Sequence, residues 1–167
     1  MTYSLRSLDS LDLPQVLTLN NEAVPAVYAL DADSLATLVA TATHSVVVTT
    51  VEDVHTVAGF VIGFAPPAEY VSESYRWLKA RSSDFLYVDR IVVAPNERGQ
   101  GLGELLYASV FQAAREARAT EVVCEVNTFP PNPQLLAFHS RLGFTTIGEQ
   151  TNTGDTGAAA LLTALVS

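Results

Sequence analysis

The sequence predicts an α/β (α+β) protein with a mixed central sheet and helices on both faces. Segments rich in valine and threonine alternate with segments whose apolar residues recur at helical spacing. One strand-like segment, residues 85–93, is apolar almost throughout, which is typical of a central strand covered on both faces. Because strands and helices alternate along the chain, we expect a mixed sheet.

The chain before residue 85 is expected to form helices and three strands. Pro14 favours a helix start, because proline is well tolerated in a first helical turn. Gly59 and Gly63 fall inside a strand pattern and predict a bulge or a close approach of two backbones. The expected elements are a first strand over 3–8, a helix from Pro14 that frays over 20–22, a turn or helix over 25–30, a helix capped by Asp33 or Ser34, and a strand pair over 45–51 and 54–64.

Residues 65–83 break this pattern. The segment carries Tyr70, Tyr75 and Trp77, and a short helix is expected over 72–79. Long irregular segments in compact proteins are often lids over a site. The alternative is a surface excursion whose aromatic residues pack on the body of the protein, and the sequence leaves both open.

The chain after residue 93 is expected to alternate helices and strands. Pro95 ends the central strand, because proline has no N–H for the sheet ladder. Gly143 should end the last helix as its C′ residue. The expected elements are a helix over 102–118, a strand over 120–127, a helix over 133–141, and strands over 144–150 and 158–166 joined around a Gly-Asp-Thr-Gly turn.

Composition limits the classes of protein that fit. The chain has 167 residues, 49% of them hydrophobic and 16% charged, which predicts one globular domain over 1–167. A net charge of −9 disfavours nucleic acid and anionic membranes as partners, and it could attract a cationic amine. We see neither an apolar run of the ~20 residues that span a bilayer nor a signal peptide. Cys124 is the only cysteine and is expected to be a small buried hydrophobe, so we expect a cytoplasmic protein.

A glycine-rich loop follows the central strand. The residues Arg98-Gly-Gln-Gly-Leu-Gly103 precede an amphipathic helix. Glycines at a helix N-terminus leave backbone N–H groups exposed, and the helix dipole adds positive character, so the loop predicts a phosphate site. Arg98 can add a charge-assisted contact. The spacing fits neither a P-loop nor the dinucleotide fingerprint.

The strand, this loop and the helix after it resemble the acyl-CoA-binding motif of the GNAT superfamily of N-acetyltransferases. A second resemblance runs from Asn132 to Phe144, where GNAT enzymes commonly show an asparagine, a short helix, an aromatic pair and a Leu-Gly-Phe ending. Together the two motifs cover roughly 85–150. The resemblance implies a GNAT-like, mostly antiparallel sheet of about six or seven strands, with acetyl-CoA as co-substrate and no metal.

The resemblance also implies a binding site. The central strand would splay from its neighbour, and the pantetheine arm would pair with its backbone while the pyrophosphate rests on the loop amides. The residues expected to bind acetyl-CoA are Ile91, Val92, Val93, Arg98, Gly99, Gln100, Gly101, Leu102, Gly103, Glu104, Asn132 and Phe138. His139 stands where the family often has a tyrosine that protonates the departing thiolate. Histidine can donate a proton, can hydrogen-bond the sulfur, or can simply pack in its helix.

Two carboxylates are candidate general bases. Alternation along the strand puts Phe85, Tyr87, Asp89, Ile91 and Val93 on one face. Asp89 is then a charge in an apolar strand beside the thioester, its alternative role being an ion pair. Alternation places the next residue, an arginine, on the opposite face, so we expect it to be a poor partner. Glu125 on the following strand is the second candidate, or else a solvent-facing strand end.

The expected function is N-acetyl transfer from acetyl-CoA to a primary amine of a small molecule or peptide, by direct attack in a ternary complex. The alternatives are a non-catalytic acyl-CoA-binding or sensing module and, more distantly, a nucleotide-binding α/β domain. The acceptor site should be built from residues 20–28 and 70–81. A homodimer is possible because the last strand could pair with a partner.

Overall fold

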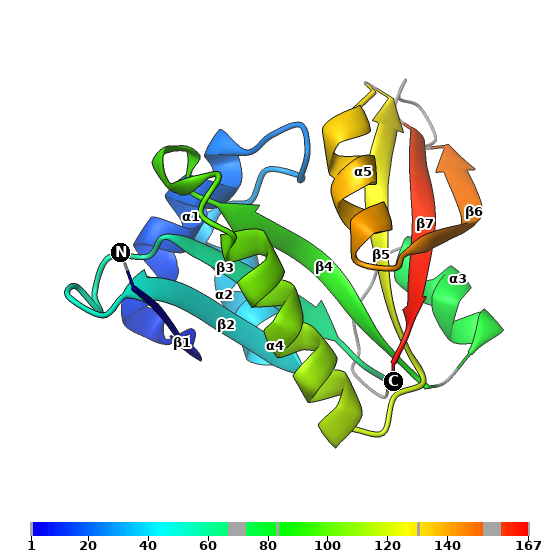
Figure 1. Cartoon of the computed structure of the whole chain (residues 1–167), viewed down its shortest axis with the longest axis horizontal. Helices are drawn as coiled ribbons and strands as arrows, with labels where there is room; N and C mark the ends of the chain where they lie inside the picture. Colours follow the sequence, from blue (N-terminus) through cyan, green and yellow to red (C-terminus); the bar gives the residue numbers. More distant parts are fainter. Residues whose placement is uncertain (1, 67–72, 83, 130, 152–157, 167) are drawn as a thin grey trace.

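The computed structural model describes residues 2–66, 73–82, 84–129, 131–151 and 158–166. Within them the strands form one seven-stranded sheet in the order β1-β2-β3-β4-β5-β7-β6 (Figure 1). Neighbouring strands are antiparallel except β4 and β5, which are parallel. The predicted mixed, mostly antiparallel sheet of six or seven strands is confirmed. The elements are β1 (Tyr3–Ser7), η1 (Ser10–Asp12), α1 (Leu13–Glu22), α2 (Ala32–Thr41), β2 (His44–Thr50), β3 (Gly59–Phe64), α3 (Glu73–Arg81), β4 (Phe85–Val93), η2 (Pro95–Glu97), α4 (Leu102–Glu116), β5 (Glu121–Phe129), α5 (Pro133–Arg141), β6 (Thr145–Thr151) and β7 (Ala158–Leu165).

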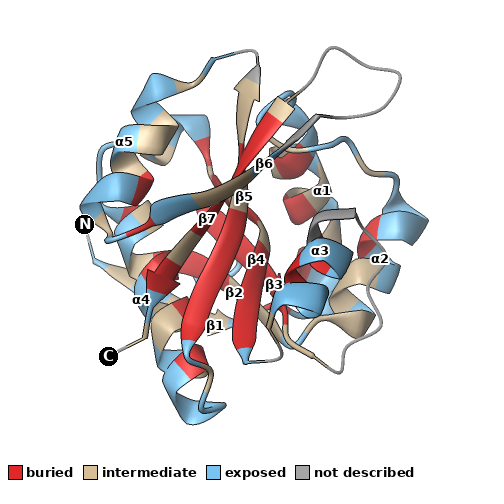
Figure 2. Ribbon diagram, turned by 90° about the vertical axis from the view of Figure 1, so that its right-hand side faces the viewer, coloured by how far each residue is buried: buried red, intermediate tan, exposed pale blue. Residues whose placement is uncertain are grey.

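The sheet separates two hydrophobic cores, which confirms helices on both faces. One core packs α4 and α5 on the sheet through residues such as Leu106, Val110 and Leu135. The other packs α1, α2 and α3 on the opposite face through residues such as Val16 and Leu35. Figure 2 shows buried strands between helices whose outer surfaces are exposed. Both faces are therefore covered, as expected from the apolar strand at 85–93.

Two local expectations near the N-terminus are wrong. The cap of α2 is Asp31, whose carboxylate accepts a hydrogen bond from the Ser34 N–H at 2.7 Å, rather than Asp33 or Ser34. The second is the start of β3, which begins at Gly59 rather than at residue 54. Residues 23–31 form turns without a further helix, which is one of the two forms expected over 25–30. At the other end, α5 has the predicted bounds and Gly143 has a φ of 96°, as expected of a left-handed C′ residue.

A bulge in β4 reverses the side-chain alternation halfway along the strand. Ile62 of β3 pairs with Arg90 and Gly63 pairs with Val88, so Asp89 is the extra residue. A Cβ on Gly63 would lie 3.0 Å from the Tyr87 carbonyl oxygen, which explains the glycine. The bulge expected from the strand glycines is therefore confirmed at this position.

The expectation that five alternate residues of β4 share one face is wrong for the same reason. Phe85 and Tyr87 pack in the core under α1 and α2, whereas Ile91 and Val93 pack against the core under α4. One inserted residue moves every later side chain to the other face. The thioester-side face of β4 therefore carries Ile91 and Val93 without Phe85 and Tyr87.

β4 and β5 diverge after the bulge, as the resemblance implied. Their pairing runs from Phe85↔Glu121 to Val88↔Cys124. Beyond that point β5 continues along β7, with Asn127 opposite Ala159. The two parallel strands thus form a fork whose closed end lies at Val88 and Cys124.

The last strand does not lie at an edge of the sheet. β7 pairs with β5 on one side and β6 on the other. The argument that β7 offers an edge to a second copy is therefore wrong. The turn expected at 154–157 lies outside the described residues.

The described part of residues 65–83 packs on the protein body. Tyr75 of α3 is buried against Phe64, Phe85 and Tyr87. The ring of Trp77 packs on Gly148, where a Cβ would lie 3.3 Å from it. These contacts favour the surface-excursion interpretation for α3, while Tyr70 lies outside the described residues.

Candidate active site

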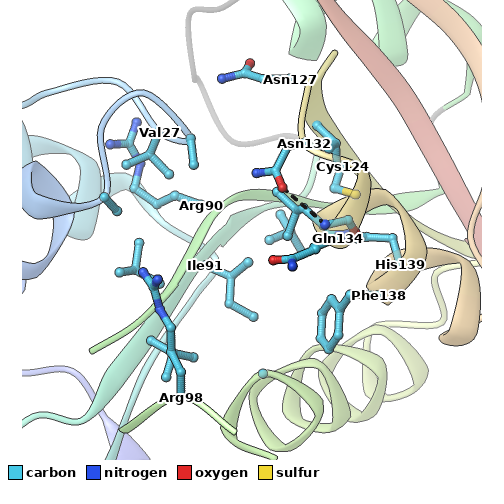
Figure 3. A pocket seen from close by; sticks show the side chains of 18 of the residues that line it. Val27, Arg90, Ile91, Arg98, Cys124, Asn127, Asn132, Gln134, Phe138 and His139 are labelled. Atoms are coloured by element: carbon cyan, nitrogen blue, oxygen red, sulfur yellow. Dashed lines mark hydrogen bonds between the residues drawn. The ribbon is translucent and has the colours of Figure 1, made fainter. Parts of the chain in front are cut away.

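A pocket of about 890 Å³ fills the fork between β4 and β5. Its walls come from the loop between α1 and α2 (residues 23–31), the second half of β4, the loop and first turn of α4, β5 and α5. Figure 3 shows side chains of β4 facing those of α5 across this space. Of the predicted site residues, all line the pocket except Gln100.

The glycine-rich loop presents the N-terminus of α4 to the pocket. Gly99 and Gly101 have φ of 81° and 78°, a left-handed conformation that favours glycine. α4 begins at Leu102, and its N-cap Gly101 makes no side-chain capping bond. The first-turn amides of α4 therefore remain as donors at the positive end of the helix dipole. Together with the exposed Arg98, they suit a phosphate group.

Gly103 is a glycine for a different reason. A Cβ at this position would lie 2.9 Å from Cζ of Phe138. The close approach lets the α5 ring pack directly on the first turn of α4. Gly103 therefore sets the distance between the two helices that flank the pocket.

Asn132 at the start of α5 is a helix cap. Its side-chain oxygen accepts a hydrogen bond from the Leu135 N–H at 3.3 Å. Gln134 and Arg141 of the same helix also line the pocket, although the sequence analysis did not single them out. Exposed polar residues on a short helix carry no local signal that they face a cavity.

Asp89 is bound to its neighbour in the chain. Its carboxylate accepts a hydrogen bond from Arg90 Nε at 2.8 Å, and the two side chains are 5% and 6% exposed. The expectation that Arg90 is a poor partner is wrong, because the bulge removes the strict alternation on which it depended. Protonating Asp89 would leave the arginine charge buried without its partner, which is costly. The carboxylate is therefore better suited to anchoring Arg90 than to accepting a proton.

Arg90 also ties β4 to the loop at residues 23–31. Its NH1 donates to the Asn20 side-chain oxygen at 3.0 Å and to the Tyr28 carbonyl at 3.2 Å. On the other arm of the fork, Asn127 donates to the Pro25 carbonyl at 2.6 Å. The loop thus spans the open end of the fork and is held from both strands.

The expected acceptor region is assembled in part. Residues 22–27 line the pocket, beside Glu125 and Asn127 of β5. No residue of α3 within the described part of the chain lines it. Glu125 is partly exposed at the pocket wall, so the second candidate base faces the cavity rather than open solvent alone.

His139 is buried and hydrogen-bonded through both ring nitrogens. Nδ1 lies 2.8 Å from the Leu135 carbonyl oxygen, and Nε2 lies 2.6 Å from the hydroxyl of Tyr107 on α4. A carbonyl can only accept, so Nδ1 carries the proton and Nε2 accepts from Tyr107. Burial lowers the pKa of His139 below its usual range, and the bond to Leu135 raises it in part. The ring is therefore neutral near pH 7.

Tyr107 was missed by the sequence analysis. It sits among apolar residues of an amphipathic helix and reads as a core residue. A buried tyrosine nevertheless needs a partner for its hydroxyl. That need, together with a histidine on a short helix nearby in the fold, is the signal that could have pointed to the pair.

Cys124 completes this polar group at the closed end of the fork. Its thiol is within hydrogen-bonding reach of the Tyr107 hydroxyl, and both side chains line the pocket. Burial raises the pKa of the thiol to about 12. A thiol that stays protonated is a poor nucleophile, so Cys124 is the small buried residue that the sequence predicted.

Comparison with known proteins identifies the family. A sequence profile described as the acetyltransferase (GNAT) family matches residues 12–144. The chain belongs to this family. The match includes both motifs on which the resemblance was based, so that inference is confirmed. No curated protein sequence matches the chain.

Solved structures share the fold of this chain over nearly the whole of both chains. Ard1 from Thermoplasma volcanium has a TM-score of 0.81 at 18% identity, covering 100% of this chain and 99% of that one. The ribosomal-protein-S18-alanine N-acetyltransferase from Escherichia coli has a TM-score of 0.75 at 18% identity, covering 99% and 95%. YncA from Salmonella typhimurium, a putative acetyltransferase solved with its cofactor acetyl-CoA, has a TM-score of 0.74 at 16% identity, covering 100% and 95%. Identities this low show a common fold.

The described residues contain neither a candidate membrane span nor a candidate metal site. No described helix is both long and apolar enough to cross a membrane. Nor do the described residues contain three or more histidine, cysteine, aspartate or glutamate side chains grouped so as to hold a metal ion.

Proposed function

We propose that this GNAT protein is an acetyl-CoA-dependent N-acetyltransferase that acts on a primary amine of a small molecule or peptide. The amine would attack the thioester directly while both substrates are bound. The single observation that carries the proposal is the fork between β4 and β5, which opens onto the uncapped N-terminus of α4. One pocket thereby joins a helix end suited to phosphate with the side of β4 that has no strand partner beyond Val88.

The acetyl-CoA half of the site consists of β4, the glycine-rich loop and α5. The pyrophosphate would rest on amides of the segment 98–104, aided by Arg98. Ile91 to Val93 pair with β3 on one side and have no strand partner on the side that faces β5, where their backbone would pair with the pantetheine arm. Its N–H groups could also polarise the thioester carbonyl. Asn132 and Phe138 would contact the arm from α5.

The acceptor half of the site lies under the loop at residues 23–31. Its charged wall residues, Glu22 and Glu125, would favour a cationic amine over an acid. Glu125 at this wall remains a candidate to receive the proton, whereas protonating Asp89 would break its ion pair with Arg90. The loop is held to both arms of the fork, so the acceptor must fit beneath it or displace it.

One observation favours the alternative of a non-catalytic acyl-CoA-binding module. His139, at the position of the usual tyrosine, accepts a hydrogen bond at Nε2 and therefore offers no proton there in its neutral state. A sensor would bind acetyl-CoA in the same fork and release no thiol.

The experiment that separates the two is thiol release from acetyl-CoA at mildly alkaline pH against a panel of amines. The panel would span polyamines, amino acids, aminoglycosides and peptide N-termini. We expect release that depends on the amine and saturates with it. Tight acetyl-CoA binding without release by any amine would contradict the transferase and support the sensor.

Gly101→Glu is the negative control for acetyl-CoA binding. A carboxylate at the N-terminus of α4 would repel the phosphates, and φ of 78° is unfavourable for any side chain. We expect this variant to lose acetyl-CoA binding by calorimetry while keeping its fold. Normal acetyl-CoA affinity in Gly101→Glu would contradict the assignment of the phosphate site.

A further inference from the structure

Three buried polar side chains meet at the closed end of the fork, each from a different element. Tyr107 comes from α4, His139 from α5 and Cys124 from β5. Tyr107 and His139 are 1% and 2% exposed, yet both form part of the pocket wall. Two of the three, Tyr107 and Cys124, were not expected to have a role in catalysis.

The hydrogen bonds fix where the protons lie. The Leu135 carbonyl holds the proton of His139 on Nδ1, so Nε2 presents a lone pair to the Tyr107 hydroxyl. A hydroxyl that donates to a basic nitrogen can accept another proton as it gives up its own. The Leu135 carbonyl also stabilises the imidazolium that this transfer creates. The arrangement has the order of an activated hydroxyl, a base and an orienting acceptor.

We propose that Tyr107 and His139 form a proton shuttle that carries the proton of the attacking amine to the departing sulfur. This inference rests on the proposed transferase function and assigns the proton transfer to this pair instead of Glu125 or Asp89. Tyr107 is the catalytic residue, because its hydroxyl would meet the reacting atoms. His139 acts through Tyr107 and stores the proton.

The reaction balances without another reactant. As the amine nitrogen bonds to the acetyl carbon, its proton passes to Tyr107 Oη while the Tyr107 proton passes to His139 Nε2. As the carbon–sulfur bond breaks and its electron pair stays on sulfur, the proton returns from Nε2 through Oη to the sulfur. The products are the amide and the free thiol, and both side chains regain their starting state.

The surroundings of the pair favour a neutral resting state. His139 is enclosed by the rings of Tyr107, Phe138 and Phe144, whose centroids lie 5.3–5.4 Å from its own. The titratable groups that face it are Tyr107 from α4 and, beyond that hydroxyl, Cys124 from β5. Other charged residues at the same pocket wall are Glu104 on α4, Glu125 on β5 and Arg141 on α5. Burial lowers the pKa of His139 below its usual range, and the hydrogen bond to the Leu135 carbonyl offsets part of this shift.

The test compares His139→Gln and Tyr107→Phe with the unaltered protein. A glutamine oxygen can still accept from Tyr107 but cannot store a proton, whereas phenylalanine removes the hydroxyl. For the unaltered protein we expect kcat to fall at acidic pH, with a midpoint below the ordinary imidazole value of about 6.5. Both variants should lose about 10²-fold or more in kcat, and His139→Gln should lose the acidic limb. Their acetyl-CoA dissociation constants should change by less than about threefold.

Phe144→Leu is the matched control, because it disturbs the packing around both rings without removing a proton-carrying group. It should lower the melting temperature while keeping the acidic limb and most of kcat. Glu125→Gln is the competing arm: if the limb disappears in this variant and persists in His139→Gln, Glu125 is the base and the shuttle is wrong. A loss of the limb in Phe144→Leu would equally overturn the proposal.

A readout without substrate tests the hydrogen-bond geometry itself. Imidazole ¹⁵N NMR of the free protein should show His139 protonated at Nδ1 near pH 7, with Nε2 titrating at acidic pH. Protonation at Nε2 in the neutral ring would overturn the proposal even if the enzyme is active. If the unaltered protein shows no amine-dependent thiol release, both the transferase function and the proton shuttle are wrong. If both variants release thiol with unchanged kinetics, only the proton shuttle is wrong.

Discussion

Glycine serves two different purposes at neighbouring positions of the site. Gly101 has a left-handed φ of 78° with open space where a Cβ would be, so its requirement is conformational. Gly103 has no such φ, and its requirement is the ring of Phe138 at 2.9 Å from a Cβ. Both residues belong to one motif, yet a substitution at each should destabilise the protein by a different mechanism.

We therefore expect Gly101→Ala and Gly103→Ala to respond differently to a change at Phe138. Gly101→Ala should destabilise the protein by about 1–2 kcal/mol through backbone strain. Gly103→Ala should cost about 1–3 kcal/mol by overpacking. Adding Phe138→Leu should recover much of the loss for Gly103→Ala and none of it for Gly101→Ala. Chemical denaturation of the four variants measures this, and equal, additive losses would refute the packing role.

At the scale of elements, the bulge and the fork depend on each other. The extra residue at Asp89 turns the β4 side chains over at the point where β4 leaves β5. It also places Asp89 beside Arg90, and this ion pair reaches the loop at residues 23–31. The end of β4 that has left β5 is thereby connected to the loop that covers it.

The bond from Asn127 to Pro25 should control access of the acceptor. In Asn127→Ala the loop at residues 23–31 loses its attachment to β5, so we expect faster amide hydrogen exchange in the loop. The KM for a small amine should rise several-fold while acetyl-CoA affinity stays within about twofold, since only acceptor binding is affected. Gln15→Ala is the matched control, because Gln15 ties α1 to His55 and Val57 away from the pocket. If Gln15→Ala raises the KM equally, the effect comes from general loosening.

At the scale of the whole molecule, a buried carboxylate ties the first strand to the helical layer. Asp12 accepts two hydrogen bonds from Arg6, at 2.7 and 2.8 Å, and one from the Asp9 N–H at 2.8 Å. The hydrogen bonds from Arg6 hold the pKa of Asp12 below its usual range, although burial opposes this. The ionised form therefore stabilises the folded state at neutral pH, and that contribution is lost as pH falls through the lowered pKa.

We expect Asp12→Asn to lower the free energy of unfolding by about 2 kcal/mol at neutral pH. The difference between the two proteins should shrink as the pH falls below about 4, where Asp12 is protonated first in the unfolded chain and, at lower pH, in the folded protein. Urea denaturation at several pH values measures both free energies. A difference that does not change with pH would mean that the ion pair with Arg6 contributes nothing.

Local sequence patterns determined much of the fold and half of the site. Helical periodicity, proline placement and a C′ glycine gave α5 its observed bounds, because these signals act within a few residues. The glycines of the loop predicted a helix start suited to phosphate, and the glycines of β3 predicted a bulge. Both predictions were possible because a backbone position that cannot accommodate a side chain requires glycine in the sequence. The family resemblance then predicted that β4 and β5 diverge.

Only the tertiary structure decided which side chains meet. The bulge placed Asp89 with Arg90, although the two-residue period of a strand assigns them to opposite faces. The insertion of β7 between β5 and β6 made the last strand an inner one. Tyr107 and His139 come from separate helices and join only because Gly103 lets α5 approach α4. Register, strand order and helix spacing arise from contacts between distant segments, and no local pattern of residues encodes them by itself.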